Sequence, residues 1–156
     1  MVKVLFVCLG NICRSPMAEA IFRKKVVEAG LEKSFVIDSA GTGDWHIGKR
    51  PHDGTLKILK DNKVDSTNML ARQVKKEDLK QFDYIIAMDA ENLGNLNKMK
   101  GKDSAAEVRR LLDYIPEAKI VDVPDPYFTG NFEEVYELVE EACNELLTYI
   151  RKKQSL

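Results

Sequence analysis

The sequence predicts an α/β fold: an open four-stranded parallel sheet with helices on both faces, in a three-layer α/β/α arrangement. Short apolar runs alternate along the chain with segments whose apolar residues recur at helical spacing. Strands that alternate with helices in this way pair in parallel and are covered on both faces. The 156 residues suit one domain, 1–156, because the chain contains no internal repeat, low-complexity tract or linker.

Four segments are expected as strands. Residues 2–7 form a short run rich in Val and Phe, which is typical of a buried strand. Further strands are expected at 34–39, at 83–88 and near 107–112. Sites in such sheets form beyond the carboxyl ends of the strands, so the loops that follow these four segments should lie near one another.

Three segments carry a helical pattern. The first helix is expected to begin at Ser15, a suitable N-cap, with Pro16 at the first helical position, and to end before Gly30. A thinner pattern covers 53–62, and an apolar stripe along 132–153 predicts a long helix.

Two further side chains are expected to have structural roles. Asp89 directly follows the third strand, where it can cap the next helix and orient nearby groups. Cys143 falls on the apolar stripe of the last helix and is expected in the core.

Composition excludes several classes of function. The 24 basic and 25 acidic residues nearly cancel, which gives no electrostatic case for nucleic acid or a membrane surface. No apolar run approaches the roughly 18 residues that a membrane span needs. Three cysteines without a recognisable export signal indicate a reducing compartment, so a cytoplasmic protein is expected. We also expect it to be a monomer.

No metal site or cofactor is expected. Cys8 and Cys13 have only two histidines to join them, His46 and His52, and both are distant in the sequence.

The segment from Cys8 to Pro16 runs from the first strand into the first helix. Its backbone N–H groups, together with the helix dipole, can form an anion-binding nest. Gly10 and Asn11 tolerate the left-handed backbone angles that an inward-curling loop requires. The loop is therefore a candidate anion site.

The side chains of this loop add phosphoryl-transfer chemistry. Cys8 would lie at the floor, where a guanidinium and a helix N-terminus favour a thiolate over a thiol. Arg14 offers a planar fork matched to two phosphoryl oxygens, and Ser15 can donate to the thiolate and help it leave. A cysteine at the end of a buried strand is usually inert, but Cys-x5-Arg-Ser between a strand and a helix is rare by chance.

The segment VLFVCLGNICRSPMAEA resembles the low-molecular-weight protein tyrosine phosphatase family, in its bacterial form. The similarity extends over essentially the whole chain. It includes the segments DSAGT (38–42), DW (44–45), ARQ (71–73), FDYIIAMD (82–89), DPY (125–127) and NFEEVY (131–136).

This resemblance implies a protein-tyrosine-phosphatase that hydrolyses phosphotyrosine in a protein or peptide through a phosphocysteine on Cys8. Arg14 would bind the phosphate, and the loop would also bind free phosphate or other oxyanions. The remaining substrate-binding residues of the loop would be Leu9, Gly10, Asn11, Ile12, Cys13 and Ser15.

The proton donor cannot be chosen by composition, since the chain has 25 acidic residues. Pro124 and Pro126 hold Asp125 in an extended loop after the last strand, although an Asp-Pro pair can equally initiate a turn. The resemblance implies that Asp125 is the general acid, and that it then deprotonates the water that hydrolyses the phosphocysteine.

Aromatic residues on predicted loops suggest the walls of the pocket. Trp45, Tyr127 and Phe128 would form a slot that holds a phenyl ring, although local packing under a loop is an equal alternative for Trp45. A deep slot admits phosphotyrosine, whereas phosphoserine is too short. His46 is expected at the rim.

The chain departs from relatives at two places. Phe128 replaces a second tyrosine after Asp-Pro, and Met69 replaces a histidine that supports the loop asparagine in some relatives. Support of Asn11 by a histidine is therefore in doubt, and Ser39 is the candidate brace.

Three alternative functions can be compared. A phosphoarginine phosphatase uses the same scaffold but tends to have Thr where Ile12 stands. An arsenate reductase needs further cysteines, and none lies between Cys13 and Cys143. A phosphate- or redox-sensing module without catalysis would have no use for Asp125.

We hypothesise that mild oxidation joins Cys8 and Cys13, which lie close together in a curled loop, and so shields Cys8 from over-oxidation. Mass spectrometry after brief peroxide treatment should detect a Cys8–Cys13 disulfide. Recovery of sulfonic acid at Cys8 without that disulfide would count against the hypothesis.

Overall fold

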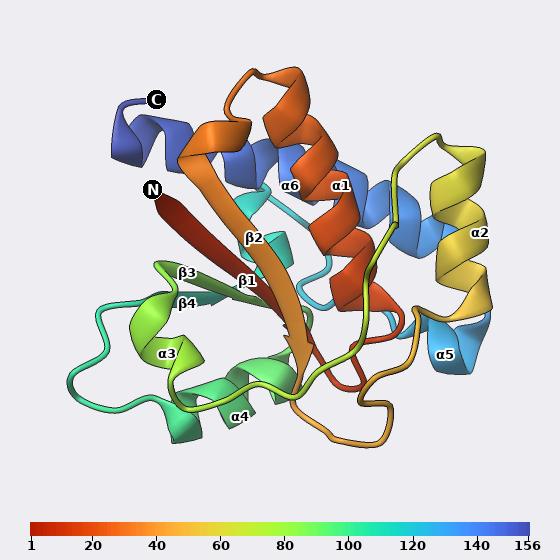
Figure 1. The fold of residues 1–156 in the computed structure, drawn as a ribbon, viewed down its shortest axis with the longest axis horizontal. Coiled ribbons are helices and arrows are strands. Elements are labelled where there is room, and N and C mark those ends of the chain that lie inside the picture. The colour runs from red at the N-terminus through yellow and green to blue at the C-terminus, as the bar shows by residue number, and fades with distance from the viewer.

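Each strand of the chain is followed by one or more helices (Figure 1). The computed structural model describes residues 1–156. The strands are β1 (Val2–Cys8), β2 (Phe35–Gly41), β3 (Tyr84–Ala87) and β4 (Glu107–Arg110). The helices are α1 (Arg14–Glu28), α2 (Asp53–Asp61), α3 (Asp78–Gln81), α4 (Ala90–Met99), α5 (Pro126–Thr129) and α6 (Phe132–Gln154), with short 3-10 helices η1 (Glu32–Ser34) and η2 (Leu111–Tyr114).

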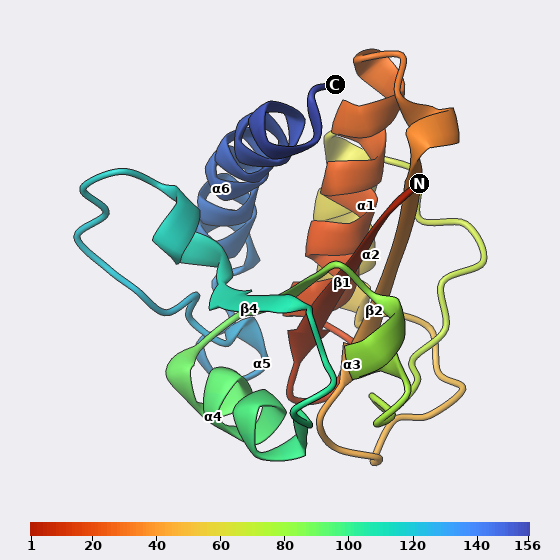
Figure 2. The ribbon, with the colours of Figure 1, turned by 90° about the vertical axis from the view of Figure 1, so that its left-hand side faces the viewer.

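The four strands form one parallel sheet in the order β2-β1-β3-β4. Helices α1, α2 and α6 lie over one face of the sheet, and α3 and α4 lie over the other (Figure 2). The predicted fold class is therefore confirmed. The register places Cys8 beside Gly41 at the carboxyl ends of the central strand β1 and the edge strand β2.

Alternation along β1 decides which layer each side chain enters. Val4, Phe6 and Cys8 belong to the core beneath α1 and α6, whereas Leu5 and Val7 belong to the core on the α3 and α4 side. All five are buried, as expected for a central parallel strand. Cys8 is thus aligned with the face on which α1 begins.

The predicted start of the first helix was wrong. The helix begins at Arg14 with Cys13 as N-cap, and Pro16 occupies its third position. Ser15 does not cap the helix, because its hydroxyl is hydrogen-bonded to Cys8 Sγ and to the side chain of Asn11. A residue type favoured at helix ends here holds the loop in place.

The other predicted elements are present with small changes of boundary. The second strand continues to Gly41, the fourth ends at Arg110, and Asp89 caps α4 by accepting the Asn92 N–H at 2.8 Å. Cys143 is fully buried, as predicted. The 3-10 helices and the short helices α3 and α5 were not predicted.

The loop around Asp125 combines both interpretations of its sequence. Asp125 itself has extended backbone angles, but Pro126 begins helix α5. Asp125 caps that helix by accepting the Tyr127 N–H at 3.1 Å.

No helix of the protein is long and apolar enough to span a bilayer.

The largest apolar side chain of α1, Phe22, packs against the sheet. Phe22 is fully buried and contacts Phe6 and Phe35 edge to face, with ring centroids 5.5 and 5.8 Å away. We expect Phe22→Ala to lower the free energy of unfolding by about 3–5 kcal/mol, because it leaves a cavity in a close-packed core. Urea unfolding measures this change.

Val27→Ala is the matched control, since Val27 lies on the same helix and is 52% exposed. Its cost should stay within about 0.5 kcal/mol. Equal losses for the two variants would contradict this description of the core.

Candidate active site

The loop between β1 and α1 curls around the sulfur of Cys8. The Asn11 N–H donates to Cys8 Sγ at 3.3 Å, and the Ser15 hydroxyl lies 2.9 Å from the same sulfur. Asn11 has a φ of 56°, the left-handed conformation that lets its N–H turn inward. The loop therefore directs hydrogen-bond donors at one point above the end of β1.

The side chain of Asn11 holds the loop in this shape. Its Nδ2 donates to Ser15 Oγ at 2.8 Å and to Ser39 Oγ at 3.0 Å, so Ser39 braces the loop as expected. Its Oδ1 accepts the backbone N–H of Arg72 at 3.0 Å. Met69 lies in the apolar core, so Asn11 has no histidine partner from this position.

Two glycines of the site lie very close to neighbouring groups. Gly10 is not left-handed, contrary to expectation; a Cβ there would lie 3.0 Å from His46 Cδ2. A Cβ on Gly41 would lie 2.8 Å from the carbonyl oxygen of Leu9. Gly41 therefore allows β2 to touch the back of the loop.

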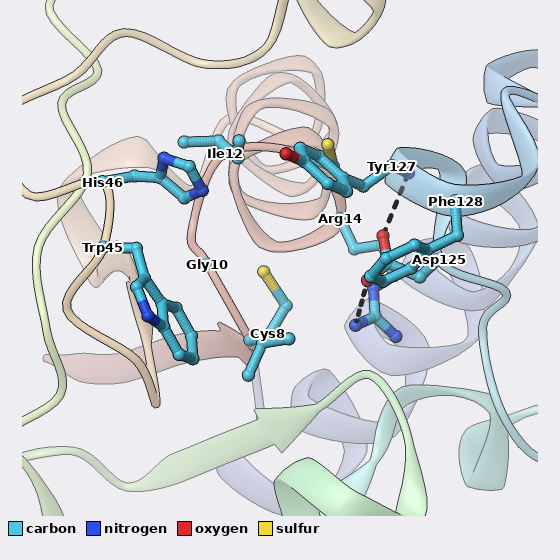
Figure 3. Close-up of a pocket in the computed structure, with 11 residues that line it drawn as sticks. Cys8, Gly10, Ile12, Arg14, Trp45, His46, Asp125, Tyr127 and Phe128 are labelled. Atoms are coloured by element: carbon cyan, nitrogen blue, oxygen red, sulfur yellow. Dashed lines mark hydrogen bonds and ion pairs between the residues drawn. The ribbon is translucent and has the colours of Figure 1, made fainter.

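Arg14 is held in place by groups from two distant loops. It is only 2% exposed, and its Nη1 donates to Asp89 Oδ2 at 2.7 Å and to the Val123 carbonyl at 3.0 Å. Its Nη2 contacts Asp125 Oδ2 at 3.3 Å (Figure 3). Asp89 thus orients the guanidinium, as its place after the third strand suggested.

The charge environment of Arg14 keeps it cationic. Burial lowers the pKa of Arg14. The Cys8 sulfur and the carboxylates of Asp89 and Asp125 raise it by more than burial lowers it, so this pKa lies above its ordinary value. A buried guanidinium that stays cationic beside the Cys8 sulfur can bind an anionic ligand.

A cavity of about 370 Å³ opens above the loop. Trp45 and His46 lie on one side of Cys8, and Tyr127 and Phe128 lie on the other, with Asp125 beside Arg14 (Figure 3). The predicted site residues that line the cavity are Cys8, Leu9, Gly10, Ile12, Cys13, Arg14, Trp45, His46, Asp125, Tyr127 and Phe128.

Asn11 and Ser15 were predicted to bind substrate but do not line the cavity. Both residues are buried, and both contact the sulfur of Cys8 without reaching the cavity. Trp45 is 64% exposed, and its indole rests on Gly43, where any Cβ would collide with the ring. The two expectations for Trp45, packing under a loop and the wall of a closed slot, are each only partly met. Trp45 forms a wall at the mouth of the cavity.

The other two cysteines differ from Cys8 in their surroundings. Cys13 is a free, buried thiol, and burial together with the charges of Cys8 and Asp125 raises its pKa to about 12. Burial also raises the pKa of Cys143 in the core. The hypothesis of a Cys8–Cys13 disulfide stays a prediction.

Sequence reasoning missed three contributors to the site. Gly41 and Arg72 lie in the DSAGT and ARQ segments, so the resemblance could have indicated them. His52 stacks on Phe132 with centroids 5.1 Å apart and lies 6.1 Å from the ring of Tyr127. No pattern in the sequence distinguishes it from a surface histidine.

Comparison with known families agrees with this geometry. The family model described as low molecular weight phosphotyrosine protein phosphatase matches residues 3–156. The chain belongs to the low molecular weight phosphotyrosine protein phosphatase family. It is therefore a phosphatase.

Individual relatives of this phosphatase cover most or all of its length. It is 56% identical over 156 residues, the full length of both chains, to the low molecular weight protein-tyrosine-phosphatase YfkJ of Bacillus subtilis. The crystal structure of YfkJ matches with a TM-score of 0.95 over 98% of this chain and 96% of that one. A low molecular weight phosphotyrosine protein phosphatase of Schizosaccharomyces pombe is 53% identical over 83% of each chain.

One solved structure carries a different name. The crystal structure of a drosophila arginine phosphatase matches with a TM-score of 0.90 and 36% identity, over 96% of this chain and 98% of that one. The phosphatase scaffold is therefore shared by proteins named for different substrates.

The contact between Gly41 and the loop of this phosphatase can be tested by Gly41→Ala. The new methyl group would press on the Leu9 carbonyl and displace the loop, so we expect inorganic phosphate to bind about tenfold more weakly. Isothermal titration calorimetry measures the affinity.

Gly94→Ala is the matched control, because a Cβ at Gly94 in α4 meets nothing within 4 Å. Its phosphate affinity should equal that of the wild type. The contact has no importance for the loop if both variants bind phosphate equally well.

Proposed function

We propose that this chain hydrolyses phosphotyrosine, in a protein or peptide, through a phosphocysteine on Cys8. The observation that carries the proposal is the meeting of Cys8, Arg14 and Asp125 in one aromatic-walled cavity, from three separate segments of the chain. Each supplies one requirement of the reaction: a nucleophile, a phosphate-binding cation and a proton donor.

In the first step, the Cys8 thiolate attacks phosphorus and the bond from phosphorus to the tyrosine oxygen breaks. Protonated Asp125 gives its proton to that oxygen, so a neutral phenol leaves. Asp89 and Val123 hold Nη1 of Arg14, so that its remaining N–H groups can bind two oxygens of the phosphoryl group. Substrate binding would replace the 3.3 Å contact between Arg14 and Asp125.

In the second step, water attacks the phosphocysteine. The Asp125 carboxylate takes a proton from this water, the bond from sulfur to phosphorus breaks, and inorganic phosphate and the Cys8 thiolate are formed. The Ser15 hydroxyl and the Asn11 N–H stabilise the departing thiolate.

The walls of the cavity support a phenyl ring as the group that carries the phosphate. Ile12 is apolar and lines the cavity with Trp45, Tyr127 and Phe128. A flat ring between such walls buries apolar surface and makes aromatic contacts. Phosphoserine has no ring that could make these contacts.

Phosphoarginine is the second candidate, because a drosophila arginine phosphatase shares the scaffold. Its guanidinium is cationic and strongly polar, and an apolar Ile12 offers it no hydrogen bond. We therefore place phosphotyrosine first.

The proposal is tested with an aryl phosphate, a phosphotyrosine peptide and a phosphoarginine peptide, with Asp125→Asn compared with the wild type. We expect kcat for the phosphotyrosine peptide to fall about 10²–10⁴-fold in Asp125→Asn, because general acid catalysis is lost. The loss should be smaller for an aryl phosphate whose phenolate leaves without protonation. Acid quenching should trap phosphocysteine on the wild type and none on Cys8→Ser.

Asp122→Asn is the matched control, since Asp122 lies three residues away, is about half exposed and does not line the cavity. Its kcat should stay near that of the wild type. A wild type that is inactive on the aryl phosphate and on the phosphotyrosine peptide, but turns over the phosphoarginine peptide, would transfer the assignment to the second candidate.

A further inference from the structure

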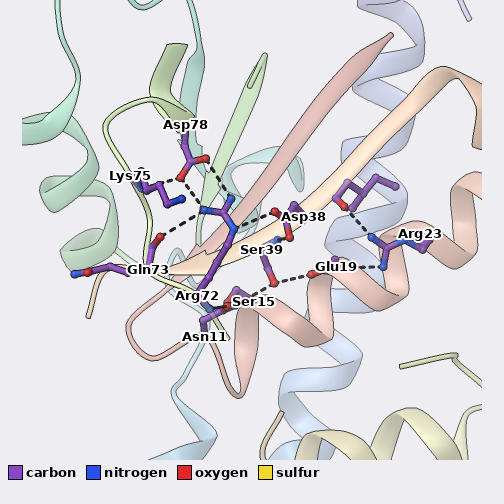
Figure 4. Close-up of polar contacts among 11 residues, drawn as sticks. Asn11, Ser15, Glu19, Arg23, Asp38, Ser39, Arg72, Gln73, Lys75 and Asp78 are labelled. Atoms are coloured by element: carbon purple, nitrogen blue, oxygen red, sulfur yellow. Dashed lines mark hydrogen bonds and ion pairs between the residues drawn. The ribbon is translucent and has the colours of Figure 1, made fainter. Parts of the chain in front are cut away.

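A cluster of ion pairs lies behind the loop, outside the cavity. The Arg72 guanidinium donates to Asp38 Oδ2 at 3.0 Å and to the two carboxylate oxygens of Asp78 at 2.9 and 3.2 Å (Figure 4). Asp38 lies in β2, and Asp78 begins α3 and is only 5% exposed. The side chain of Arg72 therefore ties its own segment to two regular elements.

The segment that contains Arg72 has little regular structure of its own, with one isolated bridge from Gln73 to Gly41. Its backbone nevertheless performs a specific task, because the Arg72 N–H donates to Asn11 Oδ1 at 3.0 Å. The ion pairs and the amide belong to the same residue. The Arg72 carbonyl also accepts the Gly41 N–H at 2.8 Å, and the ion pairs of the side chain add a second restraint on the amide.

This amide determines which way the Asn11 side chain faces. A backbone N–H can only donate, so the Asn11 atom opposite it must be the oxygen, and Nδ2 must face Ser15 and Ser39. The Ser39 hydroxyl in turn gives its single hydrogen to Glu19 Oε1 at 2.6 Å. The orientation of Asn11 thus follows from donor and acceptor chemistry.

The direction of the Ser15 hydroxyl follows as well. Ser15 Oγ accepts a hydrogen from Asn11 Nδ2, which leaves its own hydrogen for Cys8 Sγ at 2.9 Å. A thiolate can only accept, so this direction is the one that stabilises it. A reversed Asn11 amide would present an oxygen to Ser15 and draw that hydrogen away from the sulfur.

We propose that Arg72 is a positioning residue: its ion pairs with Asp38 and Asp78 hold the amide that orients Asn11, and so direct the Ser15 hydrogen at Cys8. This inference rests on the proposed function, in which the Cys8 thiolate is the leaving group of the second step. Loss of the Arg72 side chain weakens the Ser15 hydrogen bond to that thiolate. Hydrolysis of the phosphocysteine then becomes slower.

The test compares Arg72→Met with Lys25→Met. Lys25 is a matched control, because it pairs with Glu140 across α1 and α6, is similarly shielded, and contacts no member of the Asn11 network. Phosphocysteine is formed with an aryl phosphate that has a good leaving group, and its decay is followed by acid quenching. We expect decay about tenfold slower in Arg72→Met and unchanged in Lys25→Met.

The burst amplitude is the amount of phenol released as phosphocysteine first forms, per mole of protein. It separates a positioning role of Arg72 from a loss of folded protein. If Arg72 only stabilised the fold, Arg72→Met would reduce the amplitude per mole of protein and leave the rate constant of decay unchanged. Arg72→Lys keeps the charge and one ion pair at a time, so it should restore part of the lost rate.

A second comparison measures Arg72→Met and Lys25→Met in a Ser15→Ala background. Because the proposed action of Arg72 passes through the Ser15 hydroxyl, Arg72→Met should slow decay no further there. Additive effects of Arg72→Met and Ser15→Ala on the decay rate, or a wild-type decay rate in Arg72→Met alone, would overturn the inference. A wild type that forms no phosphocysteine would instead refute the proposed function.

Discussion

The central constraint in this protein is that a short loop must turn its donors inward around one sulfur. Residues in the interior of a helix or strand cannot do this, since their N–H groups are already committed to regular hydrogen bonds. The loop achieves it with Asn11 in a left-handed conformation and with Gly41 allowing β2 to touch its back. The Asn11 side chain then binds Ser15, Ser39 and the Arg72 amide, so the strained residue also holds the loop together.

The parallel sheet explains how groups from distant segments reach this loop. All four strands end at the same edge, so the residues that follow β1, β3 and β4 converge there. Asp89 follows β3 directly, whereas Asp125 arrives through the longer connection after β4. Arg14 contacts both and therefore links the loop to the far half of the sheet.

The sequence allowed the fold to be predicted because apolar periodicity records which faces are buried, and β1 and α6 are clear examples. Local propensity failed where a side chain serves a distant partner: Ser15 resembles a helix cap but binds Cys8 and Asn11. Asp125 could be selected among 25 acidic residues only by family resemblance. The role inferred for Arg72 had no signal in the residue type, because it acts through a backbone amide whose position only the folded chain defines.

The position of Trp45 has a practical consequence. It is the only tryptophan in the chain, and its indole rests on Gly43 at the mouth of the cavity, largely open to water. All intrinsic tryptophan emission of the protein therefore originates at the mouth of the cavity. The chain carries its own fluorescent reporter of cavity occupancy, without any attached dye.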